Sequence, residues 1–428
     1  MAEQHKVVIV GGGFGGLTAA QTLKGADVDV TLIDRRNFHL FQPLLYQVAT
    51  GGLSPANIAA PLRSVLRKQR NCRVVLDEVT GFDISGRAVI CRDERIPFDS
   101  LIIAAGATNN YFGKAEWEKH APGLKTVEEA TEIRRRILSA FEEAERHPDG
   151  PNRERYTTFV VVGGGATGVE MAGAISELAH HTLRKDFRNL DTAKSRILLV
   201  EGSNRILEAF PEKLSHKGEK ALQRMGVEVW TSSKVRDIHA DHVMIERDGK
   251  QLRVETATVV WGAGVRASPL GKMIADATGA TVDRGGRVVV QPDLTIPGHP
   301  NIYIVGDMAA AVSDGRPVPG VATGAIQEGK FAAKAIVKRL AGKPDVGAFR
   351  YWDKGSMATI GRNAAVAQVG WLKLTGFIAW LAWLFVHITY LISFSNRVMV
   401  LFQWFWNYVT RNRSARLITG TDADPRRV

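Results

Sequence analysis

Hydrophobic residues gather in short runs along the chain, and two of these runs end abruptly in closely spaced glycines. The first reads VVIVGGGFGG over residues 7–16, and the second reads FVVVGGGATGVE over residues 159–170. A short apolar run that stops at glycine is typical of a buried parallel strand that enters a tight turn. After the first turn, Leu17, Ala20 and Leu23 recur at helical spacing. The pattern therefore predicts a strand, a turn and a helix at both places.

The spacing of the glycines within each turn indicates a specific chemistry. In the pattern Gly-x-Gly-x-x-Gly, the first glycine permits the turn, the second lets a pyrophosphate approach the main chain, and the third lets helix pack on strand. The N–H groups at the start of the helix then hold the phosphates. The triplets are Gly11, Gly13 and Gly16 in the first turn and Gly163, Gly165 and Gly168 in the second.

Each turn is followed by a strand that ends in an acid. The segment VDVTLID ends in Asp34, and the segment RILLVEG contains Glu201. A carboxylate at this place accepts the 2′-OH of an adenosine ribose. The sequence therefore predicts two dinucleotide sites in one chain, with electrons passing between the two dinucleotides. The residues expected to bind are Gly11, Gly13, Phe14, Gly15, Gly16, Asp34 and Arg35 in the first site, and Gly163, Gly165, Thr167, Gly168, Glu170 and Glu201 in the second.

Three later apolar strands end at small residues and indicate the order of the domains. They are residues 101–113, which close on Ala105 and Gly106, residues 258–264, which close on Ala263 and Gly264, and residues 301–310, which close on Gly306 and Asp307. The last strand follows the second unit, so the second domain is predicted to be inserted in the first. A helix opened by a capping box, Thr126 with Glu129, and a polar linker near residues 147–155 precede the insertion.

The predicted fold class is α/β. It has two Rossmann-like dinucleotide-binding domains, the second inserted in the first, and a C-terminal amphipathic helical region. The expected boundaries are residues 1–155 for the first part of the outer domain, 156–265 for the inserted domain, 266–365 for the second part of the outer domain, and 366–428 for the C-terminal region.

Composition and charge narrow the class of function. A chain of 428 residues that is 45% hydrophobic can build two or three domains with cores of their own. The net charge of +12 is spread along the sequence, which favours a solvated surface over a nucleic-acid patch. The sequence enters its first strand without an apolar export segment, so we expect synthesis and retention in the cytoplasm.

Cysteine and histidine usage indicates how electrons travel. Cys72 and Cys91 are the two cysteines, and their spacing offers neither a redox-active disulfide nor the four thiolates of an iron–sulfur cluster. His180 and His181 are adjacent on a predicted helix, and no metal-binding motif is recognisable, so we expect no metal. Electron transfer is therefore expected to run directly between cofactors and substrate.

A charge-free apolar stretch marks the C-terminal region. Residues 376–394 contain no charged side chain, and as a helix they would extend about 28 Å, close to the thickness of a bilayer. Alanines dilute the stretch, however, and Thr389, Ser393 and Asn396 place a polar stripe along it. The pattern favours a helix that lies on a membrane over one that crosses it.

The following segment strengthens the membrane hypothesis. Residues 398–410, VMVLFQWFWNYVT, are too short to cross a bilayer and place polar residues on one face with aromatic residues around the rest. This is typical of a helix in the headgroup region, with tryptophans at the interface and the following arginines, Arg411, Arg413 and Arg416, on anionic lipid. A buried core, a homodimer interface and a true span are the alternatives.

The order of these motifs resembles the two-dinucleotide-binding-domain flavoprotein superfamily. Four longer segments are similar to the bacterial type II NADH:quinone oxidoreductases: residues 39–51, 101–113, 319–329 and 352–362. The resemblance covers nearly the whole chain. It implies non-covalent FAD in the first domain, with Asp307 near the ribityl chain, and NADH in the second. It also implies a membrane quinone, menaquinone or ubiquinone, as the acceptor, and a peripheral position on the cytoplasmic side of the inner membrane.

The same resemblance implies roles for individual side chains. Glu170 and Gln327 are the expected catalytic residues, and Gln327, Glu328 and Lys354 are the expected quinone contacts. Where the family often has a Gln-Gln pair, this chain has Gln327-Glu328. Ordinary structural roles remain open beside these: a carboxylate held by a helix N-terminus for Glu170, a helix surface for Gln327, and a solvated turn for Lys354.

Two other functions fit the nucleotide sites. One is a soluble NAD(P)H-dependent reductase of ferredoxin- or rubredoxin-like carriers, and the other is a flavin redox sensor that does not turn over. The aromatic C-terminal segment disfavours the first, because a soluble carrier needs no lipid anchor. Glu201 favours NADH over NADPH, since a carboxylate repels a 2′-phosphate, although Arg205 lies close by in the sequence.

Overall fold

The computed structural model describes residues 4–147, 150, 152–343 and 347–419. Within these residues the chain forms two compact units, each built from three separate stretches. Unit 1 comprises the described residues of Met1–Leu40, Ala59–Thr108 and Val265–Lys354, and unit 2 comprises those of Phe41–Ile58, Asn109–Gly264 and Gly355–Val428. The short strands β10 (Ala107–Asn109) and β18 (Val265–Ala267) lie where the chain passes from one unit to the other.

Unit 1 is built on a six-stranded sheet with the order β19-β20-β9-β1-β2-β5. These strands are β19 (Thr295–Ile296), β20 (His299–Ile304), β9 (Ser100–Ile103), β1 (His5–Val10), β2 (Val28–Asp34) and β5 (Cys72–Leu76). All neighbours from β20 to β5 pair in parallel. The predicted return of the chain is therefore observed, because β20 pairs with β9 after the whole of residues 109–264.

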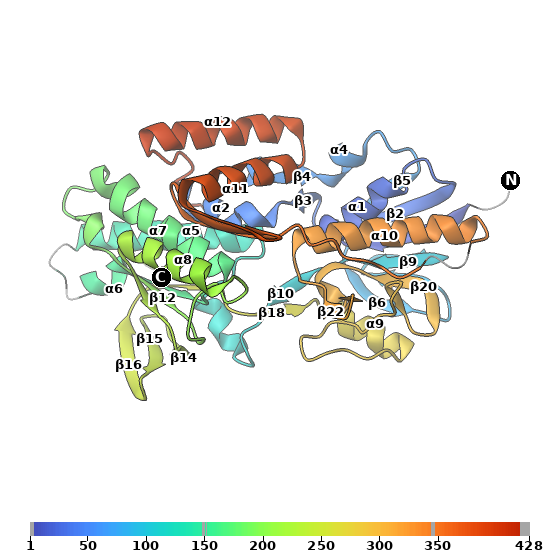
Figure 1. The fold of residues 1–428 in the computed structure, drawn as a ribbon, viewed down its shortest axis with the longest axis horizontal. Coiled ribbons are helices and arrows are strands. Elements are labelled where there is room, and N and C mark those ends of the chain that lie inside the picture. Colours follow the sequence, from blue (N-terminus) through green and yellow to red (C-terminus); the bar gives the residue numbers. More distant parts are fainter. Residues whose placement is uncertain (1–3, 148–149, 151, 344–346, 420–428) are drawn as a thin grey trace. The chain divides into compact units, whose positions relative to one another are not determined.

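Helices cover the sheet of unit 1, and smaller strands flank it. Figure 1 shows α10 running beside α1, and the glycines of the two helices permit this close approach. The helices are α1 (Phe14–Thr22), α4 (Leu62–Leu66), α9 (Leu270–Thr278) and α10 (Ala322–Leu340). The remaining strands are β3 (Phe38–Leu40), β4 (Ala59–Pro61), β6 (Val79–Asp83), β7 (Ala88–Cys91), β8 (Arg95–Pro97), β21 (Val312–Ser313) and β22 (Arg316–Pro317).

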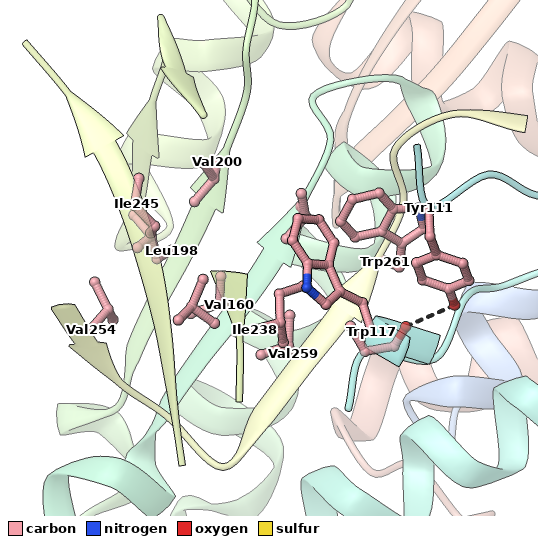
Figure 2. Close-up of a cluster of buried hydrophobic side chains, with 13 residues drawn as sticks. Tyr111, Trp117, Val160, Leu198, Val200, Ile238, Ile245, Val254, Val259 and Trp261 are labelled. Atoms are coloured by element: carbon pink, nitrogen blue, oxygen red, sulfur yellow. Dashed lines mark hydrogen bonds between the residues drawn. The ribbon is translucent and has the colours of Figure 1, made fainter. Parts of the chain in front are cut away.

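Unit 2 repeats the same plan with a four-stranded parallel sheet, β13-β12-β11-β17. The strands are β11 (Thr158–Val162), β12 (Arg196–Val200), β13 (Val227–Trp230) and β17 (Thr258–Trp261). Figure 2 shows the buried cluster between this sheet and the antiparallel strands β14 (Ser233–Ile238), β15 (His242–Arg247) and β16 (Lys250–Glu255). Trp261 lies against Tyr111 and Trp117 in this cluster, and the Tyr111 hydroxyl donates to the carbonyl of Ala121 at 2.9 Å.

The other helices of unit 2 include one predicted from its cap. Thr126 and Glu129 form the expected capping box at the start of α5 (Val127–Arg146). The insertion before β12 is filled by short helical turns, at Leu178–Thr182, Leu183–Lys185 and Thr192–Lys194. The remaining helices of this part are α2 (Leu45–Ala49), α3 (Pro55–Ile58), α6 (Arg153–Thr157), α7 (Ala166–Glu177) and α8 (Glu212–Arg224).

The C-terminal region contributes a small sheet and two helices to unit 2. The sheet is β23 (Ser356–Gly361), β24 (Ala364–Val369) and β25 (Leu372–Thr375), and the helices are α11 (Gly376–Tyr390) and α12 (Phe394–Thr410). Ala379 and Trp383 of α11 are buried against the sheet and neighbouring aromatic residues. Figure 1 shows α12 beyond α11 on the outside of the unit.

The charge-free stretch is therefore not one long helix. It breaks between Tyr390 and Phe394, where Ser393 adopts a left-handed φ of +79°. The 15 residues of α11 extend about 22 Å, which is shorter than the length expected for the unbroken stretch. In the part of the chain that the structure describes, no helix combines the length and the apolar character needed to cross a membrane.

Candidate functional site

The first glycine turn has the geometry that a pyrophosphate site requires. Gly11 has a φ of +100°, and a Cβ there would lie 2.5 Å from the carbonyl oxygen of Ala104. A Cβ on Gly16 would lie 1.8 Å from the carbonyl oxygen of Gly11, so only glycine permits this packing of helix on strand. A Cβ on Gly13 would come no closer than 4.0 Å to another atom, and Gly13 precedes α1 as an N-cap without a side-chain hydrogen bond. The N–H groups at the start of α1 are therefore available to an anion.

Asp34 lies directly beside this turn. One carboxylate oxygen accepts the N–H of Gly12 at 2.5 Å, and the other accepts the N–H of Arg36 at 2.7 Å. Burial raises the pKa of Asp34, although these two hydrogen bonds oppose the shift. A carboxylate can accept more than two hydrogen bonds, so Asp34 can still receive a ribose hydroxyl. The exposed Arg35 follows it, and Phe14 packs edge-on against His39.

Two further glycines of unit 1 follow the ends of strands β9 and β20. Gly106 and Gly306 both have left-handed φ values, +67° and +71°. The carbonyl of Gly106 accepts the N–H of Ser268, and the N–H of Gly306 donates to the Glu328 carboxyl at 2.5 Å. Asp307 follows in a single helical turn.

Glu328 is buried on the inner side of α10, with 2% of its surface exposed. Burial raises its pKa to about 8, and nearby Asp307 adds to the shift. The carboxyl is therefore mainly protonated at neutral pH and carries no net charge, as a glutamine would. A protonated glutamate at position 328 is therefore chemically close to the second glutamine of the Gln-Gln pair, although the residue type differs.

Gln327 and Lys354 both contact Trp352. The Gln327 amide donates to the carbonyl of Trp352 at 3.0 Å and accepts its N–H at 2.9 Å. It also donates to the carbonyl of Thr323. Lys354 places its ammonium group 5.3 Å from the centre of the Trp352 ring, which is 72% exposed. Gln327 is therefore not a loose side chain on a helix surface: it fixes the backbone of the segment that carries Trp352 and Lys354.

The second glycine turn reproduces the first. Gly163 has a φ of +105°, and a Cβ there would lie 2.7 Å from the backbone nitrogen of Ala263. A Cβ on Gly168 would lie 1.8 Å from the carbonyl oxygen of Gly163, and Gly165 again faces open space. Thr167 is exposed in the first turn of α7, and the carbonyl of Gly264 accepts the N–H of Asn110 at 3.3 Å.

Glu201 lies beside the second turn as Asp34 lies beside the first. Its carboxylate accepts the N–H of Gly164 at 2.5 Å and the N–H of Ser203 at 2.7 Å. Arg205 does not approach this carboxylate, because its guanidinium donates to the carbonyls of Phe210 and Glu208 at 2.8 Å each.

Glu170, also on α7, lines a cavity of about 480 Å³ in unit 2. Its carboxyl accepts the N–H of Thr359 on β23 at 3.3 Å, and burial raises its pKa to about 8. The hydrogen bond that this carboxyl accepts thus comes from a strand and not from the start of its own helix. A carboxyl with this pKa is mainly protonated at pH 7 and can give up its proton near neutral pH.

The walls of the cavity combine polar and aromatic side chains that the sequence did not single out. Trp404 donates its ring N–H to Gln47 at 2.7 Å, and the Gln47 amide donates to the Tyr46 hydroxyl at 2.8 Å. Other lining residues are Trp380, Trp383, Leu384, Tyr408, His181 and Met225. Tyr46 and Gln47 belong to residues 39–51, one of the four segments singled out in the sequence. That segment was the signal in the sequence that could have pointed to these two residues.

Arg413 closes one side of the same cavity. Its guanidinium bonds the Glu177 carboxylate at 2.7 Å and the carbonyls of Thr50 and Ala174. Arg416 likewise pairs with Asp186. The expectation that these two arginines face anionic lipid is therefore wrong, since both guanidinium groups bind acids of unit 2 and the Arg413 side chain is only 13% exposed. Arg411 is exposed.

The predicted site residues thus fall into separate groups. In unit 1, Gly11, Gly13, Gly16 and Asp34 form one turn, and Gln327 and Lys354 meet at Trp352. In unit 2, Gly163, Gly165, Gly168 and Glu201 form the second turn, and Glu170 lines the cavity. Among the described residues, no cluster of three or more His, Cys, Asp or Glu side chains has a geometry suited to a metal ion.

Comparison with known proteins indicates first the broad class of this protein and then its family. Residues 5–329 match the family of pyridine nucleotide-disulphide oxidoreductases, and residues 353–412 match the NDH2 C-terminal domain. The chain is 47% identical to the type II NADH:quinone oxidoreductase Ndh of Mycobacterium tuberculosis, over 98% of this chain and 92% of that protein. It is 48% identical to NdhA of the same organism, over 97% of this chain and 90% of that protein.

A solved structure shares the fold over nearly the whole chain. NDH2 from Plasmodium falciparum in complex with NADH superimposes with a TM-score of 0.88 at 20% identity, covering 98% of this chain and all of that one. The chain belongs to the type II NADH:quinone oxidoreductases. The resemblance inferred from the sequence motifs is thereby confirmed.

Proposed function

We propose that this flavoprotein oxidises NADH and reduces a membrane quinone, with FAD bound non-covalently in unit 1 and NADH in unit 2. The duplicated turn carries this proposal, because each copy combines an uncapped helix start, an open second glycine and an acid beside the turn. Bound FAD would supply the ring that receives the hydride of NADH and passes electrons to quinone. We retain the four sequence-derived domain boundaries as part of this proposal.

The residues of unit 1 fit FAD. The N-terminus of α1 and the open face of Gly13 suit the pyrophosphate, and Asp34 suits the ribose. Ala105, Gly106, Gly306 and Asp307 lie at the ends of strands of the same sheet, where ligands bind in parallel α/β folds. In unit 2, Thr167, Ala263, Gly264 and Glu201 surround the corresponding place for NADH.

Glu170 is the proposed proton donor. Quinone reduction consumes two electrons and two protons, so a group that is protonated at neutral pH is required near its path. Glu170 has this property and lines a cavity whose aromatic walls suit a flat apolar ring. Gln327 is assigned a positioning role, because its amide holds the Trp352 backbone and thereby orients Lys354, with Glu328 behind it.

Membrane attachment is proposed for the outer faces of α11 and α12. These faces expose large apolar side chains: Phe377, Ile378, Leu381, Phe385, Phe394, Val398, Met399, Leu401, Phe402, Phe405, Trp406 and Val409. The polar side of α12 faces the protein instead, since Asn407 donates to the carbonyl of Gly52. We infer a peripheral enzyme on the cytoplasmic face of the inner membrane, with a lipid surface and a quinone as partners, no nucleic acid, and a homodimer as the alternative use of this apolar face.

Vesicle binding tests the attachment. Removing the whole region after about residue 371 would also break the Arg413–Glu177 pair, so point substitutions are the sharper test. Phe402 and Phe405 are 61% and 64% exposed, and replacing both with serine is expected to lower sedimentation with anionic vesicles by about tenfold or more. Leu340→Ser, at an exposed apolar position on α10, is the control. Equal sedimentation of both variants would contradict the assignment.

Steady-state turnover tests the function itself. Detergent-purified protein should oxidise NADH with short-chain menaquinone or ubiquinone analogues over many cycles, and poorly with a one-electron protein carrier. The NDH2 C-terminal domain supports quinone over a ferredoxin-type carrier. A flavin that is reduced once and then stalls with every quinone would indicate a sensor. In stopped flow, Gln327→Ala is expected to slow reoxidation by quinone more than reduction by NADH.

A further inference from the structure

The loop after Glu201 brings a second carboxylate to the proposed ribose site. The N–H of Ser203 donates to the Glu201 carboxylate at 2.7 Å, and the hydroxyl of the same serine donates to the Glu208 carboxylate at 3.2 Å. Ser203 therefore joins the two acids through its backbone and its side chain. Glu208 is exposed, so its charge faces solvent.

The arginine of this loop directs its hydrogen bonds to the backbone and not to the two carboxylates. Both terminal nitrogens of Arg205 donate to backbone carbonyls, those of Phe210 and Glu208, at 2.8 Å each. Gripping a phosphate with the guanidinium fork would require breaking these hydrogen bonds. At the start of β12, the strand that leads into this loop, the Arg196 guanidinium is occupied by Glu228 in two hydrogen bonds.

We propose that Glu208, held by Ser203, is a specificity-determining residue that excludes nucleotides with a 2′-phosphate. The inference rests on the proposed NADH site and assigns a separate task to each acid. Glu201 accepts the 2′-OH and is needed for NADH itself. Glu208 has no hydroxyl to bind and acts by repelling the phosphate of NADPH. For an exposed carboxylate about 5 Å from a doubly charged phosphate, this repulsion lowers affinity by about tenfold.

Kinetic discrimination in the full flavin-containing protein tests this division of roles. For Glu208→Gln, kcat/KM with NADPH is expected to rise about tenfold, while kcat/KM with NADH stays within about twofold. Ser203→Ala frees the Glu208 side chain and should give a smaller rise. Glu201→Gln should instead lower kcat/KM with NADH. At 1 M salt, where screening acts over about 3 Å, the gain in Glu208→Gln should largely disappear.

A binding measurement that does not depend on turnover accompanies the kinetics. ADP-ribose and 2′-phospho-ADP-ribose lack the nicotinamide ring. Their competition with NADH for binding reports the preference between a 2′-OH and a 2′-phosphate. Glu208→Gln should tighten binding of the phosphorylated probe alone. Glu212→Gln removes an exposed acid four residues further along, at the start of α8, and is the matched control.

The inference and the proposed function can fail separately. A wild-type protein that does not reduce its flavin with NADH would refute the proposed function. The role of Glu208 would be overturned by a different result. In that case the wild-type protein reduces its flavin with NADH, but Glu208→Gln and Glu212→Gln show the same preference between the two probes. The proposed function would then still hold.

Discussion

The backbones of the two glycine turns differ by only a few degrees at their first residue, with φ of +100° at Gly11 and +105° at Gly163. The N–H of each first glycine donates at 2.8 Å to the end of the following strand, at Ile33 and at Val200. A Cβ on the third glycine would in both cases lie 1.8 Å from the carbonyl oxygen of the first. The two glycine turns therefore share the same backbone geometry.

The surroundings of the turns separate their functions. Two residues after the third glycine, the first copy has Thr18 and the second has the half-buried, cavity-lining Glu170. After the acid, the first copy continues with arginines at 35 and 36, whereas the second continues to Ser203 and Glu208. Under the proposed assignment, the turn supplies the pyrophosphate site, and residues just outside it determine which nucleotide binds and what chemistry follows.

The largest expected effects on cofactor binding come from adding a Cβ to the third glycine of either turn. Gly16→Ala forces a Cβ into the Gly11 carbonyl and is expected to yield protein without bound flavin. Gly168→Ala does the same in unit 2 and should leave the flavin bound while abolishing its reduction by NADH. Each substitution should destabilise its unit by about 3 kcal/mol or more. Flavin absorbance and stopped-flow reduction measure the two outcomes.

Gly81→Ala is the matched control for both substitutions. Its Cβ would lie 3.6 Å from the nearest atom, an ordinary contact, so flavin content and reduction should remain those of the wild type. Loss of flavin from both Gly16→Ala and Gly168→Ala would contradict the assignment of one nucleotide to each unit.

Glu170→Gln is expected to have an intermediate effect, confined to the second copy. Because the pKa of Glu170 is about 8, the proton that it donates is lost as pH rises through 8. Flavin reoxidation by quinone should therefore fall above pH 8 in the wild type. In Glu170→Gln it should be slower by about 10²-fold and lack this pH dependence. An unchanged pH profile in the variant would remove Glu170 from the proton path.

The same group predicts how stability depends on pH. The folded-state pKa of about 8 lies above the ordinary value of 4.5, so the folded state holds a proton that the unfolded chain has released. The unfolding free energy contributed by Glu170 therefore falls as pH rises from about 4.5 to 8 and then levels off. Denaturant titrations across this range should show a smaller decline in Glu170→Gln than in the wild type.

The smallest effect is expected for Glu328→Gln in unit 1. Since burial also raises the pKa of Glu328 to about 8, the wild-type side chain is already mostly neutral at pH 7. A glutamine can accept the N–H of Gly306 in its place. Flavin content and turnover at pH 7 should change by about twofold at most, whereas activity above pH 8 should become less sensitive to pH. A large loss at pH 7 would show that the ionised form is needed.

The local parts of this fold could be predicted from the sequence. Both glycine turns, the strands that end at Asp34 and before Glu201, and the Thr126 capping box depend on residues close together in the chain. The return of β20 to the first sheet was also visible, because its apolar run ends in Gly306. Short-range patterns of this kind specify local backbone geometry directly.

Long-range contacts could not be predicted in this way. Arg413 looked like a lipid-facing residue because its partner, Glu177, lies far away in the sequence. The break at Ser393 has no proline or glycine to announce it. The raised pKa of Glu170 depends on burial against β23, which follows from packing and not from any local pattern.

The assembly of unit 2 from distant stretches has a consequence for its synthesis. Residues 41–58 and 109–264 leave the ribosome before 355–419, although the cavity needs all three stretches. At about 5–20 residues per second, α7 waits on the order of ten seconds or more for α11 and α12. During that interval the surfaces around Tyr46 and Ala174 lack their later cover, and the nascent chain is prone to aggregate. Translation speed over residues 265–410 is therefore expected to influence yield.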